Sequence, residues 1–222
     1  MAKDRIGLFG GTFNPVHSGH IHAAQRVRAR FGLREILFIP SYIPPHKETR
    51  DLAPAADRLE MVRLAVRGLP GLTACAVEVE ARQTSYAVLT LDKMKNRYPG
   101  AWLFFILGTD AFLEIETWRD HRHLLEECHW IVMTRPGWPR DRVAAALGDS
   151  HGKRSHLLAE SETPDEDLFG RARIIFMDVD ALDISSSAIR EAVRSGRPLG
   201  DLVPAAVEAH IRSRHLYQKD NG

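Results

Sequence analysis

The chain has 222 residues, which is long enough to bury a substantial core in one domain or in one domain with an appended piece. A composition with 44% hydrophobic and 27% charged residues excludes a disordered or a fibrous protein. The 30 basic and 29 acidic residues leave a formal net charge of +1, which argues against a broad nucleic-acid-binding surface but allows a local basic pocket for phosphates. We therefore expect a globular protein that binds no nucleic-acid polymer.

The cysteines and the chain start indicate the compartment. Cys75 and Cys128 lie far apart in apolar segments, which is typical of reduced core thiols and not of a disulfide framework or a zinc site. Residues 1–5 run straight into a short apolar segment without a signal-peptide pattern, and no stretch approaches the roughly 20 apolar residues of a membrane span. We expect a cytoplasmic location and no membrane partner.

The first part of the chain predicts a strand, a helix and a second strand. Residues 6–9 and 35–39 are apolar runs of strand length, ended by glycines and by a proline. Residues 18–31 between them have apolar or small side chains at helical spacing, namely Ile21, Ala24, Val27 and Phe31.

Strands and helices alternate through most of the remaining chain. Helices are predicted over 54–69 and 85–98, the second with Ser85 as its N-cap, and a strand is predicted over 73–79. Continuous apolar runs of the kind found in buried parallel strands lie at 102–107, 130–133 and 174–177. This alternation predicts a doubly wound, mostly parallel α/β sheet of Rossmann-like type, with its active site at the carboxyl ends of the strands.

The domain organisation is predicted to be a single domain over 1–222. Residues 148–172 are polar and lack periodicity, which predicts a surface insertion that could serve as a lid, as a contact arm or as a loop without a role. Helices are expected to close the chain over about 186–217.

The turn after the first strand has the composition of a phosphate site. Glycines at Gly10 and Gly11, followed by Thr12, allow backbone N–H groups to approach a phosphate, and the next helix points its positive dipole end at the same place. His17 and His20 are three residues apart on one helical face, and Gly19 leaves room between them.

Imidazoles there can donate hydrogen bonds, and when protonated also positive charge, to phosphate oxygens under in-line attack. A single histidine near a helix start would more often be a surface or capping residue. His22 does not fit the spacing of the pair and is expected to face solvent.

Further polar residues follow the strands and helix starts. Ser186, Ser187 and Arg190 are predicted to converge on one anionic spot, the alternative being a serine N-cap with an exposed arginine. Asp110 follows a buried strand and Gly108, where its carboxylate could accept ribose hydroxyls or cap a helix.

A loop and two tryptophans contain further candidate residues. His46 and Lys47 follow two prolines in a loop at the same edge, where the lysine is either a mobile charge for phosphate or simply solvated. Trp118 offers a flat face for stacking or for core packing, and Trp102 is expected in the core.

Residues 10–20, which read Gly-Gly-Thr-Phe-Asn-Pro-Val-His-Ser-Gly-His, resemble the opening signature of the bacterial nicotinate-nucleotide adenylyltransferases, within the HxGH nucleotidyltransferase superfamily. The resemblance continues in order along nearly the whole chain, except for the insertion. The matching segments are 41–47, 84–86, 108–112, Trp118, 135–137 and 184–190.

The resemblance implies a nucleotidyltransferase fold and transfer of the adenylyl group of ATP to nicotinate mononucleotide, with Mg²⁺ held mainly by the ATP phosphates and by no protein metal ligand. The catalytic residues it implies are His17, His20, Lys47 and Arg190. The implied ATP-binding residues are Gly10, Gly11, Thr12, Phe13, His20, Gly108, Asp110, Ser186, Ser187 and Arg190. Those implied for the mononucleotide are Thr12, His46, Lys47, Thr84, Trp118 and Arg135.

Alternatives stay open at this point. Phosphopantetheine adenylyltransferases share the histidine pair and a serine-rich C-terminal motif, although they are typically shorter and are not expected to carry Pro44-Pro45-His46-Lys47 or Trp118. A binding module that only holds a dinucleotide is a second alternative, but the G-x-G-x-x-G fingerprint and the P-loop pattern are both absent. The preference for acid or amide mononucleotide and assembly as a homo-oligomer are also left open.

Overall fold

The computed structural model describes residues 3–45, 51–134, 154–180 and 182–218. The chain divides into two compact units. Unit 1 consists of Met1–Gly10, Arg26–Ile36 and Tyr86–Asp180, and unit 2 consists of Gly11–Gln25, Leu37–Ser85 and Ala181–Gly222. Within the described part of the chain, no helix is both long enough and apolar enough to cross a membrane.

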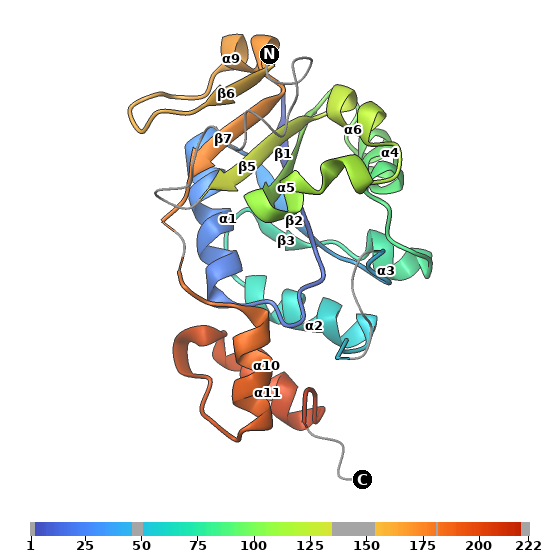
Figure 1. Ribbon diagram of the computed structural model, residues 1–222, viewed down its shortest axis with the longest axis vertical. Helices are drawn as coiled ribbons and strands as arrows, with labels where there is room; N and C mark the ends of the chain where they lie inside the picture. Colours follow the sequence, from blue (N-terminus) through green and yellow to red (C-terminus); the bar gives the residue numbers. More distant parts are fainter. Residues whose placement is uncertain (1–2, 46–50, 135–153, 181, 219–222) are drawn as a thin grey trace. The chain divides into compact units, whose positions relative to one another are not determined.

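The fold is built on a seven-stranded sheet with the strand order β3-β2-β1-β4-β5-β7-β6, which confirms the predicted α/β class (Figure 1). The pairs β1·β4, β4·β5, β5·β7 and β6·β7 are all parallel. The strands are β1 (Arg5–Gly11), β2 (Glu35–Pro40), β3 (Leu72–Ala74), β4 (Trp102–Gly108), β5 (His129–Thr134), β6 (Ser155–Leu157) and β7 (Ile174–Asp178).

Unit 1 has its core on both faces of the central strands. Phe105 of β4 lies opposite Trp130 of β5, and Ile131 lies opposite Ile175 of β7. All four side chains are buried, which explains why these strands are continuous apolar runs in the sequence. The helices of this unit are α4 (Ala87–Arg97), α5 (Thr109–Leu113), η1 (Ile115–Thr117), α6 (His121–Glu127) and α9 (Glu166–Arg171).

Unit 2 is mostly helical, and a buried carboxylate links two of its helices by hydrogen bonds. Asp57 of α2 accepts hydrogen bonds from His210 Nε2 at 3.0 Å and Arg214 Nε at 3.1 Å, which joins α2 to α11 and its C-terminal end. Figure 1 shows α10 and α11 beside each other near the C-terminus. The helices are α2 (Ala55–Val66), α3 (Val77–Ala81), α10 (Ser186–Arg194), η2 (Gly200–Leu202) and α11 (Ala205–Ser213), while α1 (Ser18–Phe31) has residues in both units.

Several sequence predictions about elements are confirmed. Helix α1 has the predicted bounds and buries Ala24, Val27 and Phe31. Both cysteines are buried and form no disulfide within the described residues, and burial raises the pKa of the Cys128 thiol.

Two predicted elements are wrong in part. The strand predicted over 73–79 ends at Ala74 and is followed by helix α3. Ser85 is not the N-cap of α4, because Tyr86 occupies that position and the Ser85 hydroxyl instead accepts a hydrogen bond from the Tyr42 N–H at 2.9 Å.

The predicted insertion at 148–172 contains regular structure in its described part. Strand β6 pairs with β7 at the edge of the sheet, and α9 buries Leu168 and Phe169. The side chain of Asp165 caps α9 by accepting a hydrogen bond from Leu168 N–H at 2.9 Å. This segment therefore belongs to the sheet and core of unit 1, and the prediction of a surface loop is wrong for it.

Candidate functional site

The turn between β1 and α1 is held by backbone hydrogen bonding and aromatic packing within unit 2. The Gly11 carbonyl accepts a hydrogen bond from Ser41 N–H at 3.0 Å. Phe13 has a left-handed φ of 48°, and its ring packs 5.2 Å from His20 and 5.6 Å from Phe38. Because the Phe13 side chain is buried, its predicted contact with ATP could be made only through the backbone.

The histidine pair at the start of α1 is close-packed. The rings of His17 and His20 lie 3.6 Å apart between centroids, at an angle of 33°. His20 Nδ1 accepts a hydrogen bond from the His17 backbone N–H at 3.2 Å, so the proton of a neutral His20 sits on Nε2. His17 Nδ1 is buried and has no hydrogen-bond partner among the described residues. His17 thus has a ring nitrogen that the described part of the chain does not use.

Burial sets the protonation state of His17. Its side chain is only 7% exposed, and desolvation lowers its pKa to about 4. His17 is therefore neutral near pH 7 in this structure, whereas the sequence also allowed a charged form. His22, which was expected to face solvent, is half-buried, and its buried Nε2 has no described partner. That expectation is wrong.

Gly19 gives the His17 ring its space, as the sequence predicts. A Cβ placed on Gly19 would lie 3.1 Å from His17 Nδ1 and 3.2 Å from its Cε1. These distances are shorter than ordinary van der Waals contact, so any side chain here would push against the imidazole. Gly10 differs, because no described atom lies within 4 Å of the corresponding Cβ position.

The C-terminal motif lies against the histidine turn. Ser186 Oγ donates a hydrogen bond to the Pro15 carbonyl at 2.9 Å, and Arg190 Nη1 donates to the Asn14 carbonyl at 3.0 Å. Ser185 is the N-cap of α10 and accepts from Ala188 N–H at 3.1 Å. Ser186 and Pro15 are 171 residues apart in sequence. Two distant segments of the chain thus form one cluster.

The guanidinium of Arg190 is partly engaged by the protein. Its Nη2 lies 3.5 Å from Ser187 Oγ, and its buried Nε has no described partner. Ser187 itself is exposed at the first turn of α10. These groups are the ones predicted to meet an anion, and the Asn14 carbonyl is an additional partner that the sequence did not indicate.

Asn14 connects the turn to two further segments. Its Nδ2 donates to the Asp51 carbonyl at 2.8 Å, and its Oδ1 accepts from Ala53 N–H at 3.0 Å and from the Tyr217 hydroxyl at 2.8 Å. Sequence reasoning missed this role because the partners are distant in sequence. Only the Asn-Pro dipeptide, a common turn signal, marked the position.

The segments predicted for the mononucleotide also meet within unit 2. Ile43 forms a parallel β-bridge with Thr84, and Ser85 N–H donates to the Ile43 carbonyl at 3.0 Å. Thr84 is half-buried beside this bridge. His46, Lys47 and Arg135, three of the predicted site residues, lie outside the described residues.

The candidates in unit 1 follow strand β4. Gly108 ends the strand and is the N-cap of α5, and Asp110 is exposed in the first turn of that helix. Thr109 is buried and donates from Oγ1 to the Met133 carbonyl at 2.9 Å, which anchors the helix start to β5. Trp118 is half-buried, with its ring edge-on to buried Trp130 at 6.2 Å.

Trp102 differs from its predicted core position. It is half-buried at the first residue of β4, where its ring stacks on His129 at 5.1 Å with an interplanar angle of 9°. The first residue of a strand is less enclosed than the middle, which explains the partial exposure.

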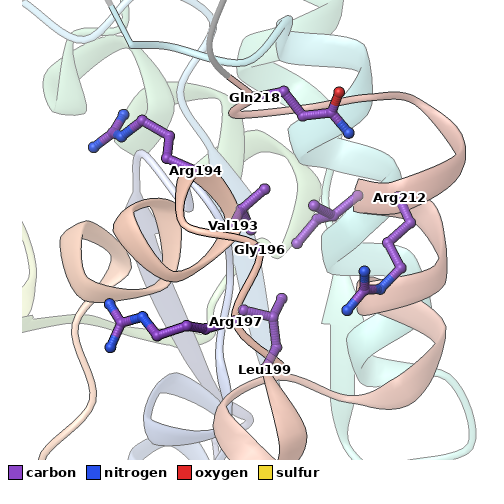
Figure 2. A pocket seen from close by; sticks show the side chains of 8 residues that line it. Val193, Arg194, Gly196, Arg197, Leu199, Arg212 and Gln218 are labelled. Atoms are coloured by element: carbon purple, nitrogen blue, oxygen red, sulfur yellow. The ribbon is translucent and has the colours of Figure 1, made fainter.

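A hollow of about 380 Å³ lies between α10 and α11 but is separate from these clusters (Figure 2). Figure 2 shows Arg212 on the opposite side of the view from Arg194 and Arg197, so the three guanidinium groups do not converge. Arg194 and Arg212 already pair with Glu191 and Glu208 of their own helices. None of the predicted site residues lines this hollow.

The described residues contain no group of three or more His, Cys, Asp or Glu side chains placed to hold a metal ion. The motif offers imidazole nitrogens, whereas Mg²⁺ prefers oxygen ligands. The described residues therefore do not fit a magnesium cage made by the protein.

Comparison with known proteins identifies relatives along the whole chain. Residues 8–192 match the family model described as cytidylyltransferase-like. A protein of Desulfatibacillum aliphaticivorans named "Probable nicotinate-nucleotide adenylyltransferase" is 40% identical over 217 residues, covering 96% of this chain and 99% of the relative. A protein of Moorella thermoacetica with the same name is 39% identical over 215 residues, covering 96% of this chain and 92% of the relative.

A solved structure supports the fold. The Plasmodium falciparum nicotinic acid mononucleotide adenylyltransferase complexed with NaAD matches with a TM-score of 0.68, covering 96% of this chain and 97% of that chain. Its sequence is 17% identical, so this likeness concerns the fold alone.

Proposed function

Because the chain belongs to the family of nicotinate-nucleotide adenylyltransferases, we propose that it transfers the adenylyl group of ATP to nicotinate mononucleotide. The products are nicotinate adenine dinucleotide and pyrophosphate, in NAD biosynthesis. The observation that carries this proposal is the 40% identity to a relative of that name, covering 96% of this chain and 99% of the relative.

The reaction is an in-line displacement at the α-phosphorus of ATP. An oxygen of the mononucleotide 5′-phosphate forms the new P–O bond, and the bond from the α-phosphorus to the bridging oxygen of pyrophosphate breaks. Both substrates are anions, so the protein must neutralise charge and hold two phosphates in line. No side-chain nucleophile and no covalent intermediate are needed.

In this proposal the histidine pair stabilises charge on the reacting phosphates. His20 directs its Nε2–H to a phosphate oxygen, because its Nδ1 is occupied by the His17 N–H. His17 is neutral before substrate binds, and its neutral ring can donate a hydrogen bond from one nitrogen to a phosphate oxygen. An adjacent phosphate anion also raises the pKa of His17.

The serines and Arg190 complete the proposed phosphate site. Ser186 and Arg190 hold the Asn14–Pro15 carbonyls, while Ser187 and the remaining donors of Arg190 face the ATP phosphates. Gly10, Gly11, Thr12 and Phe13 contribute through their backbone. Lys47 is proposed to add a mobile charge between the two substrates.

The remaining predicted residues are assigned to the two nucleosides. Gly108 and Asp110 are proposed to meet the adenosine part, and the mononucleotide is proposed to contact Thr84, Trp118, His46 and Arg135. Mg²⁺ is proposed to accompany the ATP phosphates, and the steps above use only the residues of the chain. A cytoplasmic location belongs to the same proposal and is supported by the two buried cysteines, which form no disulfide within the described residues.

The test is product formation from ATP with nicotinate mononucleotide, nicotinamide mononucleotide or 4′-phosphopantetheine as acceptor, in the presence of Mg²⁺. We expect pyrophosphate and dinucleotide in equal amounts, with the highest kcat/KM for nicotinate mononucleotide. A higher kcat/KM for phosphopantetheine would replace the proposed acceptor. Nucleotide binding without pyrophosphate release would mean a binding module instead of an enzyme.

A further inference from the structure

Arg58 of α2 is a fully buried arginine that donates three hydrogen bonds to backbone carbonyls of described residues. Its Nε donates to the Ala53 carbonyl at 2.9 Å, Nη1 donates to Thr12 at 2.7 Å, and Nη2 donates to Tyr42 at 2.9 Å. The side chain is 0% exposed. One guanidinium thus joins the turn after β1, the segment after β2 and the start of α2, all within unit 2.

Burying this charge is costly, so its retention needs an explanation. Desolvation lowers the pKa of Arg58 to about 10, and the guanidinium still remains protonated near pH 7. Its hydrogen-bond acceptors are neutral carbonyls, and the charge of Glu78 favours the protonated guanidinium. A hydrophobic side chain would avoid the desolvation penalty but would leave the three carbonyls without this donor, so the guanidinium links three segments that packing alone would not hold in register.

The hydrogen bonds orient two peptide groups. In a trans peptide the C=O and the next N–H point in opposite directions, and Asn14–Pro15 is the cis bond recorded in the described chain. Holding the Thr12 carbonyl against Arg58 therefore directs the Phe13 N–H to the other side of the turn. Holding the Tyr42 carbonyl fixes in the same manner the peptide plane that enters the bridge between Ile43 and Thr84.

We propose that Arg58 is a positioning residue for the adenylyl transfer, because its planar guanidinium sets the peptide planes of the phosphate turn and of the mononucleotide segment together. This inference rests on the proposed function for the identity of the two substrates. Arg58 does not touch substrate. It acts through the Thr12 and Tyr42 carbonyls, and its buried positive charge also favours an anion on the opposite side of the turn.

The first test compares Arg58→Lys and Arg58→Met with Arg63→Met, an exposed arginine on the same helix that pairs with Glu60 at 3.6 Å. Lysine keeps the charge but lacks the fork that reaches three acceptors at once. We expect kcat/KM to fall on the order of 10²-fold in both Arg58 variants, as misplacement of reacting groups does elsewhere, and to stay near wild type in Arg63→Met. Activities are compared at a temperature where circular dichroism shows each variant to be folded.

Chemical rescue separates positioning from folding. Millimolar guanidinium added to Arg58→Ala should restore kcat/KM by about tenfold or more, because the ion can fill the cavity and donate to the same carbonyls. It should have no such effect on His17→Ala, which serves as the control. Folded Arg58→Lys with kcat and both KM values within about threefold of wild type would overturn the proposal.

A binding measurement keeps this inference separate from the proposed function. Calorimetric titration with inorganic pyrophosphate needs no turnover, and we expect the affinity of Arg58→Lys to be at least about tenfold weaker than that of wild type. Equal affinities would count against the role of Arg58. A wild-type chain that binds pyrophosphate but makes no dinucleotide would count against the proposed function alone.

Discussion

His17 in unit 2 and His129 in unit 1 are both buried, and desolvation lowers the pKa of each to about 4. Their hydrogen bonding is different. His129 donates from Nε2 to the Phe169 carbonyl at 2.9 Å and stacks on Trp102, whereas His17 Nδ1 has no described partner. A lowered pKa therefore reports burial in both cases. The unused ring nitrogen beside a second histidine is what distinguishes a candidate site from a core residue.

The largest expected effect tests the difference between His17 and His129 directly. His17→Ala should lower kcat on the order of 10²-fold or more while the protein stays folded, because it removes a group that stabilises charge on the phosphates. His129→Ala should leave kcat near wild type and lower the free energy of unfolding, because it removes a packed ring and a buried hydrogen bond. Steady-state kinetics and urea denaturation of both variants check this. Equal losses of kcat would remove the distinction between the two histidines.

Gly19→Ala should give the next largest effect. The added methyl group would lie 3.1 Å from His17 Nδ1, so the ring must shift by a few tenths of an ångström. We expect kcat/KM to fall on the order of 30-fold, since reacting groups tolerate little displacement. Gly170→Ala in α9 is the matched control, because no described atom lies within 4 Å of the new Cβ. A Gly19→Ala enzyme with unchanged kinetics would show that the position of His17 is not critical.

Trp118 and Trp102 are both half-buried and allow a second comparison between a candidate site residue and a structural residue. Trp118→Ala should raise KM for the mononucleotide on the order of tenfold with a smaller change in KM for ATP, if its ring stacks on the pyridine. Trp102→Ala should leave both KM values unchanged and reduce stability, because its ring already stacks on His129. A rise in KM for ATP alone after Trp118→Ala would contradict the assignment of Trp118 to the mononucleotide.

Much of the sheet could be predicted from the sequence because its central strands are buried on both faces. Residues 103–107 of β4 are all buried, and the sequence shows them as one apolar run. The strand predicted at 73–79 failed for a reason outside the segment. Cys75 N–H bonds to the Phe38 carbonyl and β2 ends at Pro40, so the alternating Val77 and Val79 have little β2 strand left to pair with and instead begin α3.

The elements in the described part of the predicted insertion could not be predicted from the sequence for a different reason. Strand β6 is a short edge strand, and polar residues are tolerated at a sheet edge, so its sequence resembles a loop. Helix α9 has six residues, too few for helical periodicity to appear.

The histidine pair and the serines could be predicted because their chemistry is local in sequence. Arg58 was missed because arginine is rarely fully buried and its acceptors are 5, 46 and 16 residues away. The sequence did contain one signal that Arg58 is buried. Arg58 lies three, four and seven residues before the buried Met61, Val62 and Ala65, which places it on the apolar face of α2.

The smallest expected effect is a change in titration. In the absence of substrate both His17 and His129 should titrate near pH 4, and unfolding frees them to bind protons below about pH 6.5, their ordinary value. The stability that they contribute is thus fully present above pH 6.5 and is lost as the pH falls toward 4. Bound ATP should raise the pKa of His17 by about half a unit or more, because an adjacent phosphate favours the charged ring, and should leave His129 unchanged. NMR titration of the imidazole Cε1–H signals measures both, with His17→Asn and His129→Gln identifying the resonances. An equal shift of the two would mean that ATP acts on the whole protein, and the unpartnered nitrogen of His17 would lose its significance as the mark of the site.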